Sequence, residues 1–273
     1  MSLKVFEHGV QRAPTILFLH GMGVSSWMWQ EQIELLSDNY HCLAVDLPGN
    51  GESYQVEWVS LKATAVQVAD IIEQKATGGE AHVVGLSLGG YTAVTLLANH
   101  PERVSSLIVS GMTTRPFSKR WFYRPLIAAL IPTMKWDMMI NLNMKVMRIP
   151  EDVMPLYRRD SKRVPKVALQ RVYAEVLNFN LPQQLTGTYV PVLAVAGDEE
   201  TRLVQAGLTD FLQRLPHSVT ALVPDAHHGW NGEHPTLFTE MVRSWIEEQP
   251  LPDALQILDD RHYPMSGLVK AAK

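Results

Sequence analysis

Ser87 stands in a G-x-S-x-G pattern with Gly85 and Gly89, which is typical of a serine nucleophile. An apolar run at 81–84 precedes the pattern, and a small-residue segment with helical character follows it at 88–99. Small neighbours let a serine adopt strained backbone angles in a tight strand-to-helix turn. The first N–H groups of the following helix can stabilise a developing oxyanion. This context predicts that Ser87 is the nucleophile of a covalent reaction.

A histidine base must lie within hydrogen-bond reach of such a serine. The segment 225–235 offers His227, His228 and His234. It lies at the end of the expected order of nucleophile, acid and base, so the base is expected among these three. His234 precedes Pro235, a helix start, and is typical of a cap or surface residue. The spacing gives no pair of histidines four apart on a helix with a third ligand, so no metal site is predicted.

The acid that would orient the histidine is expected after the apolar run 191–196. Asp198, Glu199 and Glu200 follow one another there. A carboxylate in this role fixes the histidine tautomer and stabilises the imidazolium ion. Any of the three is a candidate, and at least two of them are expected to be solvated loop charges.

A second glycine turn follows the apolar run 15–19 and contains His20 and Met22. The backbone N–H of Met22 is predicted to pair with that of Leu88 as an oxyanion hole. Two such donors would each contribute about 3–4 kcal/mol of transition-state stabilisation. His20 is interpreted as a residue that organises the loop rather than as the base.

Short apolar runs without strict alternation alternate with helical patterns along the chain. Such runs suit strands buried on both faces of a parallel sheet. The alternation predicts an α/β fold with a mostly parallel sheet. The expected strands are 15–19, 41–45, 81–84, 104–109, 191–196 and 218–223, and the expected helices include 61–75, 88–99 and 238–248.

Residues 113–188 interrupt this alternation and are predicted to form a helical cap. The segment is rich in methionine and proline and contains no convincing strand. It carries thirteen Lys and Arg against five Asp and Glu, a net charge of +8, which leaves −12 for the rest of the chain. Either its basic faces complement an acidic core, or they attract anionic substrates or an anionic surface.

The bulk composition excludes several classes of function. With 273 residues, 46% of them hydrophobic, the chain fits one large domain or one domain with an insertion. A net charge of −4 gives no footprint for nucleic-acid binding. No apolar run is long enough to span a bilayer and no signal peptide is recognised, so a cytoplasmic protein is expected. The single cysteine, Cys42, is expected to be a buried small hydrophobe.

Together these motifs resemble those of the α/β-hydrolase superfamily. The resemblance rests on His20-Gly, the loop 46–53, the serine pattern 85–90 and the His228 segment with its Glu-x-Pro at 233–235, and it covers about residues 14–248. It implies an eight-stranded, mostly parallel sheet with a helical cap inserted after the sixth strand. The implied domains are a core of 1–112 and 189–250, the cap 113–188 and a C-terminal tail 251–273. The tail is expected to pack on the body, pair with another subunit or stay disordered.

The resemblance also assigns roles. Ser87 matches the nucleophile, and Met22 and Leu88 match the oxyanion positions. The family's histidine commonly precedes a Glu-x-Pro by five residues, which selects His228. The family acid is commonly an aspartate three residues after the glycine that ends its strand, and here that position is Glu200.

The sequence departs from the family pattern at two places. Glu200 carries one more methylene group than the usual aspartate, which changes its reach, and Asp198 stays the alternative acid. His227 stands where a glycine commonly precedes the base, and it is expected to narrow the site or change the surroundings of the base.

The implied activity is hydrolysis of a carboxylic ester, lactone or thioester through an acyl-enzyme, with a small-molecule substrate and no cofactor. The alternatives are carbon–carbon bond hydrolysis of diketo acids and a non-hydrolytic role as a lyase, perhydrolase or ligand receptor. The cap and tail are candidate contact surfaces of a homodimer. Substrate-binding candidates, each also fitting the interior of the cap or core, are Trp29, Trp121, Met138, Phe122, Trp136, Met139 and Met147.

Overall fold

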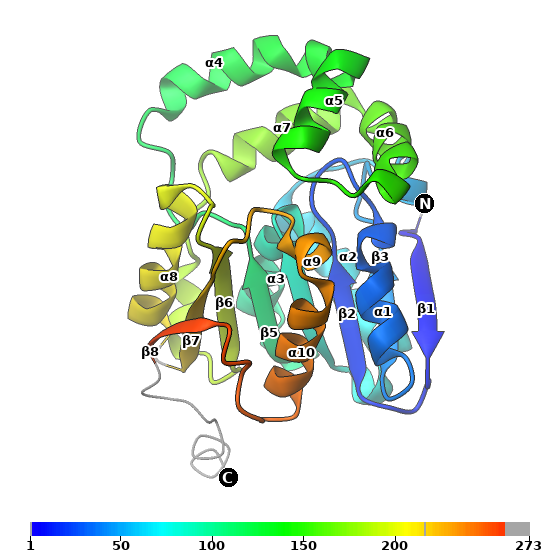
Figure 1. The fold of residues 1–273 in the computed structure, drawn as a ribbon, viewed down its shortest axis with the longest axis vertical. Helices are drawn as coiled ribbons and strands as arrows, with labels where there is room; N and C mark the ends of the chain where they lie inside the picture. Colours follow the sequence, from blue (N-terminus) through cyan, green and yellow to red (C-terminus); the bar gives the residue numbers. More distant parts are fainter. Residues whose placement is uncertain (1, 216, 260–273) are drawn as a thin grey trace.

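The computed structural model describes residues 2–215 and 217–259, with a central eight-stranded sheet (Figure 1). The strand order is β1-β3-β2-β4-β5-β6-β7-β8. Strands β2 to β7 run parallel, whereas β1 and β8 pair antiparallel with β3 and β7 at the two edges. This confirms the predicted mostly parallel sheet. The strands are Val5–Gly9 (β1), Thr15–Leu19 (β2), His41–Val45 (β3), Ala81–Leu86 (β4), Val104–Ser110 (β5), Val192–Gly197 (β6), Ser218–Val223 (β7) and Gln256–Asp259 (β8).

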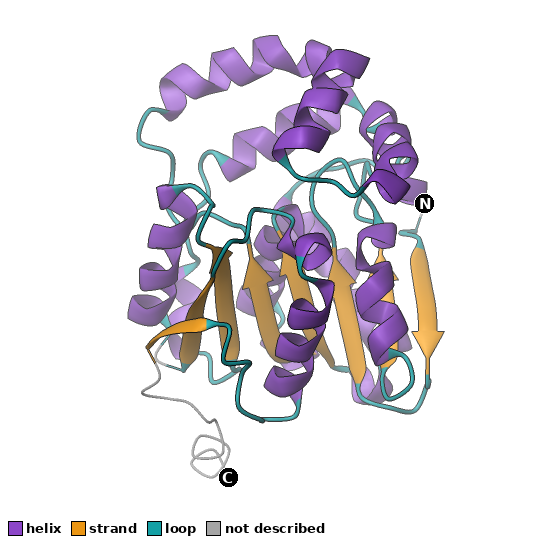
Figure 2. Ribbon diagram, in the orientation of Figure 1, coloured by secondary structure: helices purple, strands orange, loops and turns teal. Residues whose placement is uncertain are grey.

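Helices cover both faces of the sheet (Figure 2). Because strand side chains alternate between faces, Leu17 and Leu19 of β2 pack with α2, α3 and α8, whereas Ile16 and Phe18 pack with α1 and α10. Burial on both faces explains why the inner strands are continuous apolar runs. The core helices are Gln30–Leu36 (α1), Leu61–Lys75 (α2), Leu88–Asn99 (α3), Arg202–Arg214 (α8), Trp230–Glu233 (α9) and Pro235–Ile246 (α10).

The helical segment predicted at 113–188 lies between β5 and β6 and sits at the carboxyl end of the parallel strands (Figure 1). Its helices are Arg120–Leu130 (α4), Asp137–Val146 (α5), Met154–Arg163 (α6) and Lys166–Val176 (α7), and the 3₁₀ turn Ile131–Lys135 (η5) joins α4 to α5. The insertion follows the fifth strand in chain order, not the sixth as the resemblance implied.

The eighth strand comes instead from the segment that was expected to be a separate tail. Residues 256–259 pair with β7, with Ala221 opposite Ile257 and Leu222 opposite Gln256. This part of the tail therefore packs on the body and belongs to the core sheet, while 260–273 lie outside the described residues.

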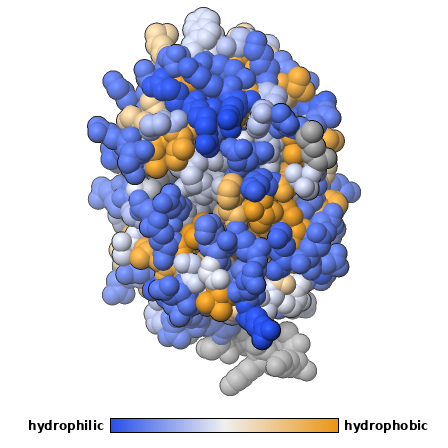
Figure 3. All heavy atoms as spheres, turned by 90° about the vertical axis from the view of Figure 1, so that its right-hand side faces the viewer, coloured by the Kyte–Doolittle hydropathy of each residue, from blue (hydrophilic) through white to orange (hydrophobic). Residues whose placement is uncertain are grey.

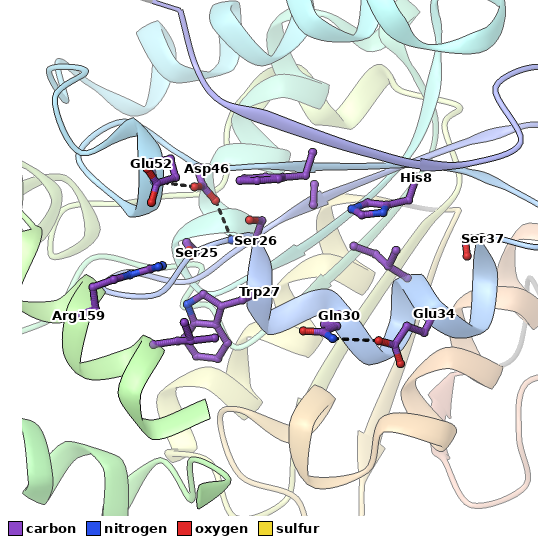
Figure 4. Close-up of a pocket in the computed structure, with 14 residues that line it drawn as sticks. His8, Ser25, Ser26, Trp27, Gln30, Glu34, Ser37, Asp46, Glu52 and Arg159 are labelled. Carbon is purple, nitrogen blue, oxygen red and sulfur yellow. Dashed lines mark hydrogen bonds between the residues drawn. The ribbon is translucent and has the colours of Figure 1, made fainter. Parts of the chain in front are cut away.

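A buried carboxylate ties the cap to the core. Asp160 on α6 is fully buried and accepts hydrogen bonds from Ser25 Oγ at 2.7 Å and Trp27 Nε1 at 2.8 Å. Its other oxygen accepts from Arg159 Nε at 2.7 Å. A cavity of about 490 Å³ lies beside this junction, and Figure 4 shows Arg159 pointing toward the loop that carries Ser25 and Ser26.

Cys42 is buried in β3, as expected for a small hydrophobe, and burial raises the pKa of its thiol to about 12. Among the helices that the structure describes, none combines the length and apolar character needed to cross a membrane.

Candidate active site

Ser87 occupies a strained turn between β4 and α3. Its φ of 56° and ψ of −116° lie outside the regions that L-residues usually adopt. Two glycines make the turn feasible, because a Cβ at Gly85 would lie 2.5 Å from the carbonyl oxygen of Gly89, and one at Gly89 would lie 1.9 Å from that of Leu19. The N–H of Ser87 donates to the carbonyl oxygen of Ser110 at 2.9 Å. Strain of this kind is characteristic of functional sites.

His228 and Glu200 form a hydrogen-bonded pair near this turn. His228 lies between β7 and α9, and Glu200 lies in the turn after β6. The Nδ1 of His228 is 2.7 Å from Glu200 Oε1, and the other carboxylate oxygen accepts from the N–H of Gly197 at 3.2 Å. The Glu200 side chain is only 3% exposed, whereas that of His228 is 30% exposed. The carboxylate is therefore shielded from water, and the imidazole is held by one nitrogen with the other left for a substrate or nucleophile.

The other two carboxylates in this turn have different positions. Asp198 Oδ1 accepts from the N–H of Ala226 at 3.3 Å and so connects the turns that carry Glu200 and His228. Glu199 lines the cavity at Ser87 and donates its N–H to the carbonyl oxygen of Ala226.

The neighbouring histidines have partners of their own. His227 Nδ1 is 3.2 Å from Oε2 of Glu233, the glutamate of the Glu-x-Pro, although His227 also lines the cavity. The half-buried His234 has its Nε2 3.4 Å from the carbonyl oxygen of Asp225. Within the described part of the chain, no three His, Cys, Asp or Glu side chains are grouped so as to hold a metal ion.

One cavity of about 450 Å³ brings together all five residues that the sequence assigned to nucleophile, base, acid and oxyanion hole. Its walls are mostly apolar, and the cap contributes a large part of them. Among the described residues no lysine or arginine lines it. The lining residues are Met22, Ser87, Leu88, Tyr91, Gly111, Thr113, Phe117, Val146, Met147, Val172, Tyr173, Val176, Glu199, Glu200, Thr201, Val204, His227 and His228.

The two predicted oxyanion donors lie on opposite sides of Ser87 along the chain. Leu88 is the first residue of α3, so its N–H has no partner within the helix. Met22 lies in the loop after β2, and this loop approaches the nucleophile closely, since a Cβ at Gly21 would lie 3.5 Å from the Cβ of Ser87.

His20 organises this loop, as predicted. The ring is fully buried, with Nδ1 2.6 Å from the carbonyl oxygen of Gly21 and Nε2 accepting from the N–H of Leu47 at 2.9 Å. Burial lowers the pKa of His20, which favours the neutral ring with its proton on Nδ1. Both ring nitrogens are engaged, so His20 is not available as a base.

Gly111 is a site residue that the sequence reasoning missed. It directly follows β5 with φ of +69°, and a Cβ there would lie 2.9 Å from Cε1 and 3.0 Å from Nδ1 of His228. The same Cβ would lie 3.6 Å from Glu200 Oε1. The absence of a side chain at Gly111 makes room for the histidine–glutamate pair. A glycine directly after a buried strand was the available signal.

The three residues predicted to bind substrate do not line the cavity. Trp29 is fully buried and packs against Phe18 and Phe238 on the sheet face covered by α1 and α10. Trp121 and Met138 are 76% and 69% exposed on the outside of the cap.

Among the further candidates, the cavity lining includes only Met147. Phe122, Trp136 and Met139 are not among the lining residues. The helical pattern of the cap was recognised, but the faces that its helices turn toward the core were assigned wrongly.

Comparison with known proteins identifies the family of the chain. The model of the alpha/beta hydrolase family matches residues 16–241. An AB hydrolase superfamily protein from Gibberella zeae is 29% identical over 252 residues, covering 89% of this chain and 84% of that protein. A pimeloyl-[acyl-carrier protein] methyl ester esterase from Aeromonas hydrophila subsp. hydrophila is 27% identical, covering 90% of this chain and all of the relative.

Among solved structures, the enol-lactonase from Burkholderia xenovorans LB400 superposes with a TM-score of 0.77 at 21% identity, covering 90% of this chain and 96% of that one. At this identity the likeness concerns the fold. Because the family model matches most of this chain, the chain belongs to the α/β hydrolase family.

Proposed function

We propose that this protein is a carboxylic ester hydrolase that acts through an acyl-enzyme on Ser87. The observation that carries the proposal is the shared cavity, in which a serine on a strained strand-to-helix turn accompanies a histidine whose Nδ1 is bound to a buried carboxylate. The name of the Aeromonas relative, a methyl ester esterase, supports the same reaction class.

In the first half-reaction, Ser87 Oγ attacks the ester carbonyl carbon while His228 Nε2 takes the hydroxyl proton. Glu200 holds the imidazole through Nδ1 and stabilises the positive charge that it acquires. The carbonyl oxygen becomes an oxyanion, for which the N–H groups of Leu88 and Met22 are the proposed donors. The imidazolium then gives its proton to the leaving alcohol, and the acyl group stays on Ser87.

In the second half-reaction, water replaces the alcohol. His228 takes a proton from the water as it attacks the acyl carbon, and returns that proton to Ser87 Oγ when the carboxylic acid leaves. The enzyme is regenerated without a cofactor. Removing a single oxyanion donor from such a site typically costs about 10²–10³-fold in kcat.

The cavity favours a neutral, apolar acyl group. Its cap-derived walls include Phe117, Met147, Val172 and Val176, and no lysine or arginine among the described residues lines it. A carboxylate buried there would lack a cationic partner, which is costly. This argues against diketo acids as substrates and hence against carbon–carbon bond hydrolysis. The basic character of the cap lies elsewhere on its surface.

A fluorophosphonate probe tests the proposal directly. We expect a covalent adduct on Ser87, located by mass spectrometry, that is absent in Ser87→Ala and slowed in Glu200→Gln. Neutral p-nitrophenyl esters should be hydrolysed faster than esters of dicarboxylic acids with a free carboxylate. A folded wild-type protein that takes no adduct and cleaves no ester would refute the proposal and would favour a ligand receptor.

A further inference from the structure

Helix α4 is exposed on almost every side, although its sequence is rich in aromatic and aliphatic residues. Ten of its eleven residues are exposed, and only Ile127 packs partly against the core. The helix forms the top edge of the cap, and η5 joins it to α5 (Figure 1). We call residues 119–148, which comprise α4, η5, α5 and their flanks, the cap rim.

Exposed apolar side chains are concentrated on the cap rim. Nine of the sixteen large hydrophobic residues that are exposed in the described chain lie in these thirty positions. On α5, Met138, Leu142 and Val146 recur every four residues, so they form one outward stripe. A concentration of exposed apolar side chains of this kind marks an interaction site. The nine residues are Trp121, Phe122, Tyr123, Leu126, Leu130, Trp136, Met138, Leu142 and Val146.

The cap rim is also strongly basic, and its cations are unpaired. It contains six Lys and Arg residues and one acid, Asp137. Asp137 is already bound to Arg158 and Lys162 of α6. Within the described residues, none of the six rim cations makes an ion pair, and five are exposed. The five exposed cations are Lys119, Arg120, Arg124, Lys145 and Arg148.

Most of the other cations of the cap are paired, with Lys166 as the exception among the described residues. Arg159, Arg163 and Arg171 pair with carboxylates of the cap or the core. The side of the molecule that carries β1 and α6 is mainly hydrophilic across the middle of the cap, as Figure 3 shows. Unpaired cations and exposed aromatic groups are therefore concentrated together on the cap rim.

We propose that the cap rim docks on an anionic phospholipid bilayer. A short helix with Trp, Phe and Leu beside Arg and Lys has the composition of one that lies in the plane of a membrane interface. Trp and Tyr favour this zone because one end of the ring system is apolar and the other is polar. The unpaired cations meet the negative potential of the lipid headgroups. A bilayer satisfies both features at once and needs no preformed groove.

The docked orientation would turn the active-site cavity toward the lipid. Val146 ends the outward stripe of α5 and also lines the cavity, as does Phe117 just before α4. The apolar rim is thus continuous with the cavity wall. If the protein is the ester hydrolase proposed above, this arrangement would give it access to esters dissolved in a membrane, but lipid binding itself does not depend on that function.

Co-sedimentation with vesicles tests the proposal. The vesicles contain equal parts of phosphatidylcholine and phosphatidylglycerol, and pure phosphatidylcholine serves as the neutral comparison. We expect binding to the anionic vesicles that weakens with added salt. Because each basic residue near an anionic surface contributes a factor of about five, Arg120→Gln with Arg124→Gln should weaken binding about 25-fold. Trp121→Gln with Phe122→Gln should also weaken binding, and a blue shift of tryptophan emission should decrease with it.

Matched controls lie at the opposite end of the molecule. Arg12 and Tyr189 are exposed residues that precede β2 and β6 at the amino edge of the sheet. Arg12→Gln and Tyr189→Gln should leave vesicle binding unchanged, and Ser87→Ala should bind as the wild type does even if it is inactive. The substituted rim and control residues are exposed, so their folding can be verified by an unchanged Tm.

Three results would overturn the proposal. The first is an absence of binding to anionic vesicles. This result would overturn the proposal even if an acidic protein were found to bind the cap rim. The second is loss of self-association, rather than of lipid binding, in the rim variants, which would identify the rim as a contact between two copies of the chain. The third is equal weakening of binding in the rim variants and in the controls at the amino edge.

Discussion

Replacing Gly111 by alanine would insert a methyl group between β5 and the histidine–glutamate pair. The added Cβ would lie 2.9 Å from Cε1 of His228, whereas carbon atoms in ordinary contact are about 3.5 Å apart. The imidazole would therefore have to move by about 0.6 Å. Since Glu200 holds the same ring at 2.7 Å, the movement would disturb both the base and its partner.

The size of the effect follows from the geometry. A misplacement of about 1 Å in a catalytic group can cost about 10²-fold in rate. A shift of about 0.6 Å in His228 should accordingly lower kcat by about tenfold or more. Alanine at φ of +69° also costs about 1–2 kcal/mol of backbone strain. This strain should lower the Tm by about 2–8 °C.

Gly78→Ala is the matched control for backbone strain. Gly78 has a nearly identical φ of +73°, but nothing lies within 4 Å of the position that an added Cβ would occupy. Both variants should lose stability in a thermal scan, and Gly111→Ala should lose at least as much as Gly78→Ala because it adds the contact with His228. In a p-nitrophenyl ester assay, only Gly111→Ala should lose kcat, and its labelling by a fluorophosphonate should slow in parallel.

The reasoning would be refuted if Gly111→Ala retained wild-type kcat below its Tm, because the methyl group would then not displace the histidine. It would equally be refuted if Gly78→Ala lost kcat to the same extent. In that case the loss would come from strain or partial unfolding and not from the contact with His228.

Three further outcomes are expected. Glu200→Gln should lower kcat by about 10³-fold or more, because it removes the charge that stabilises the imidazolium. Asp198→Asn should leave kcat unchanged, because the Asp198 side chain contacts the backbone. Steady-state kinetics in which Asp198→Asn loses more activity than Glu200→Gln would assign the acid to Asp198. Asp160→Ala should destabilise the protein by about 3 kcal/mol, since the buried donors Ser25 and Trp27 lose their acceptor. Asp152→Ala, at an exposed position, should leave the Tm unchanged. Equal Tm values for the two variants would contradict the role of the buried carboxylate. Burial lowers the pKa of His82 from 6.5 to about 4, so below pH 6.5 the unfolded chain takes up a proton that the folded protein does not. Denaturant titrations should show a loss of about 3 kcal/mol between pH 6.5 and 4 that is absent in His82→Gln, and parallel pH profiles for the two proteins would exclude this cause.

The positions of the candidate residues could be predicted from the sequence where the determinant is local. The turn at Ser87 follows from glycines next to the residue itself, and the offset of Glu200 from Gly197 lies within one turn. Strands buried on both faces are recognisable because every side chain in them is apolar. The edge strands β1 and β8 lack this signal, since one side of each faces water, and neither was recognised.

The missed features depend on contacts between distant segments. Gly111 leaves room for His228, which approaches it from a different part of the chain, and no spacing within the sequence encodes that distance. In the cap, an apolar pattern predicts a helix but not which face is covered. Met147 lines the cavity and Met138 is exposed, although the two are similar in type and only nine positions apart.

The two strands that flank the cap have a consequence for the modularity of this enzyme. β5 and β6 are neighbours in the sheet, with Leu107 opposite Val192 and Ser110 opposite Val195, so the chain leaves and re-enters the core at adjacent points. Ser87, Glu200 and His228 all lie outside the inserted segment. The cap can therefore be lengthened, shortened or replaced without a change in the order or pairing of the strands. A change in the cap would alter the walls of the cavity while Ser87, Glu200 and His228 keep their places on the core.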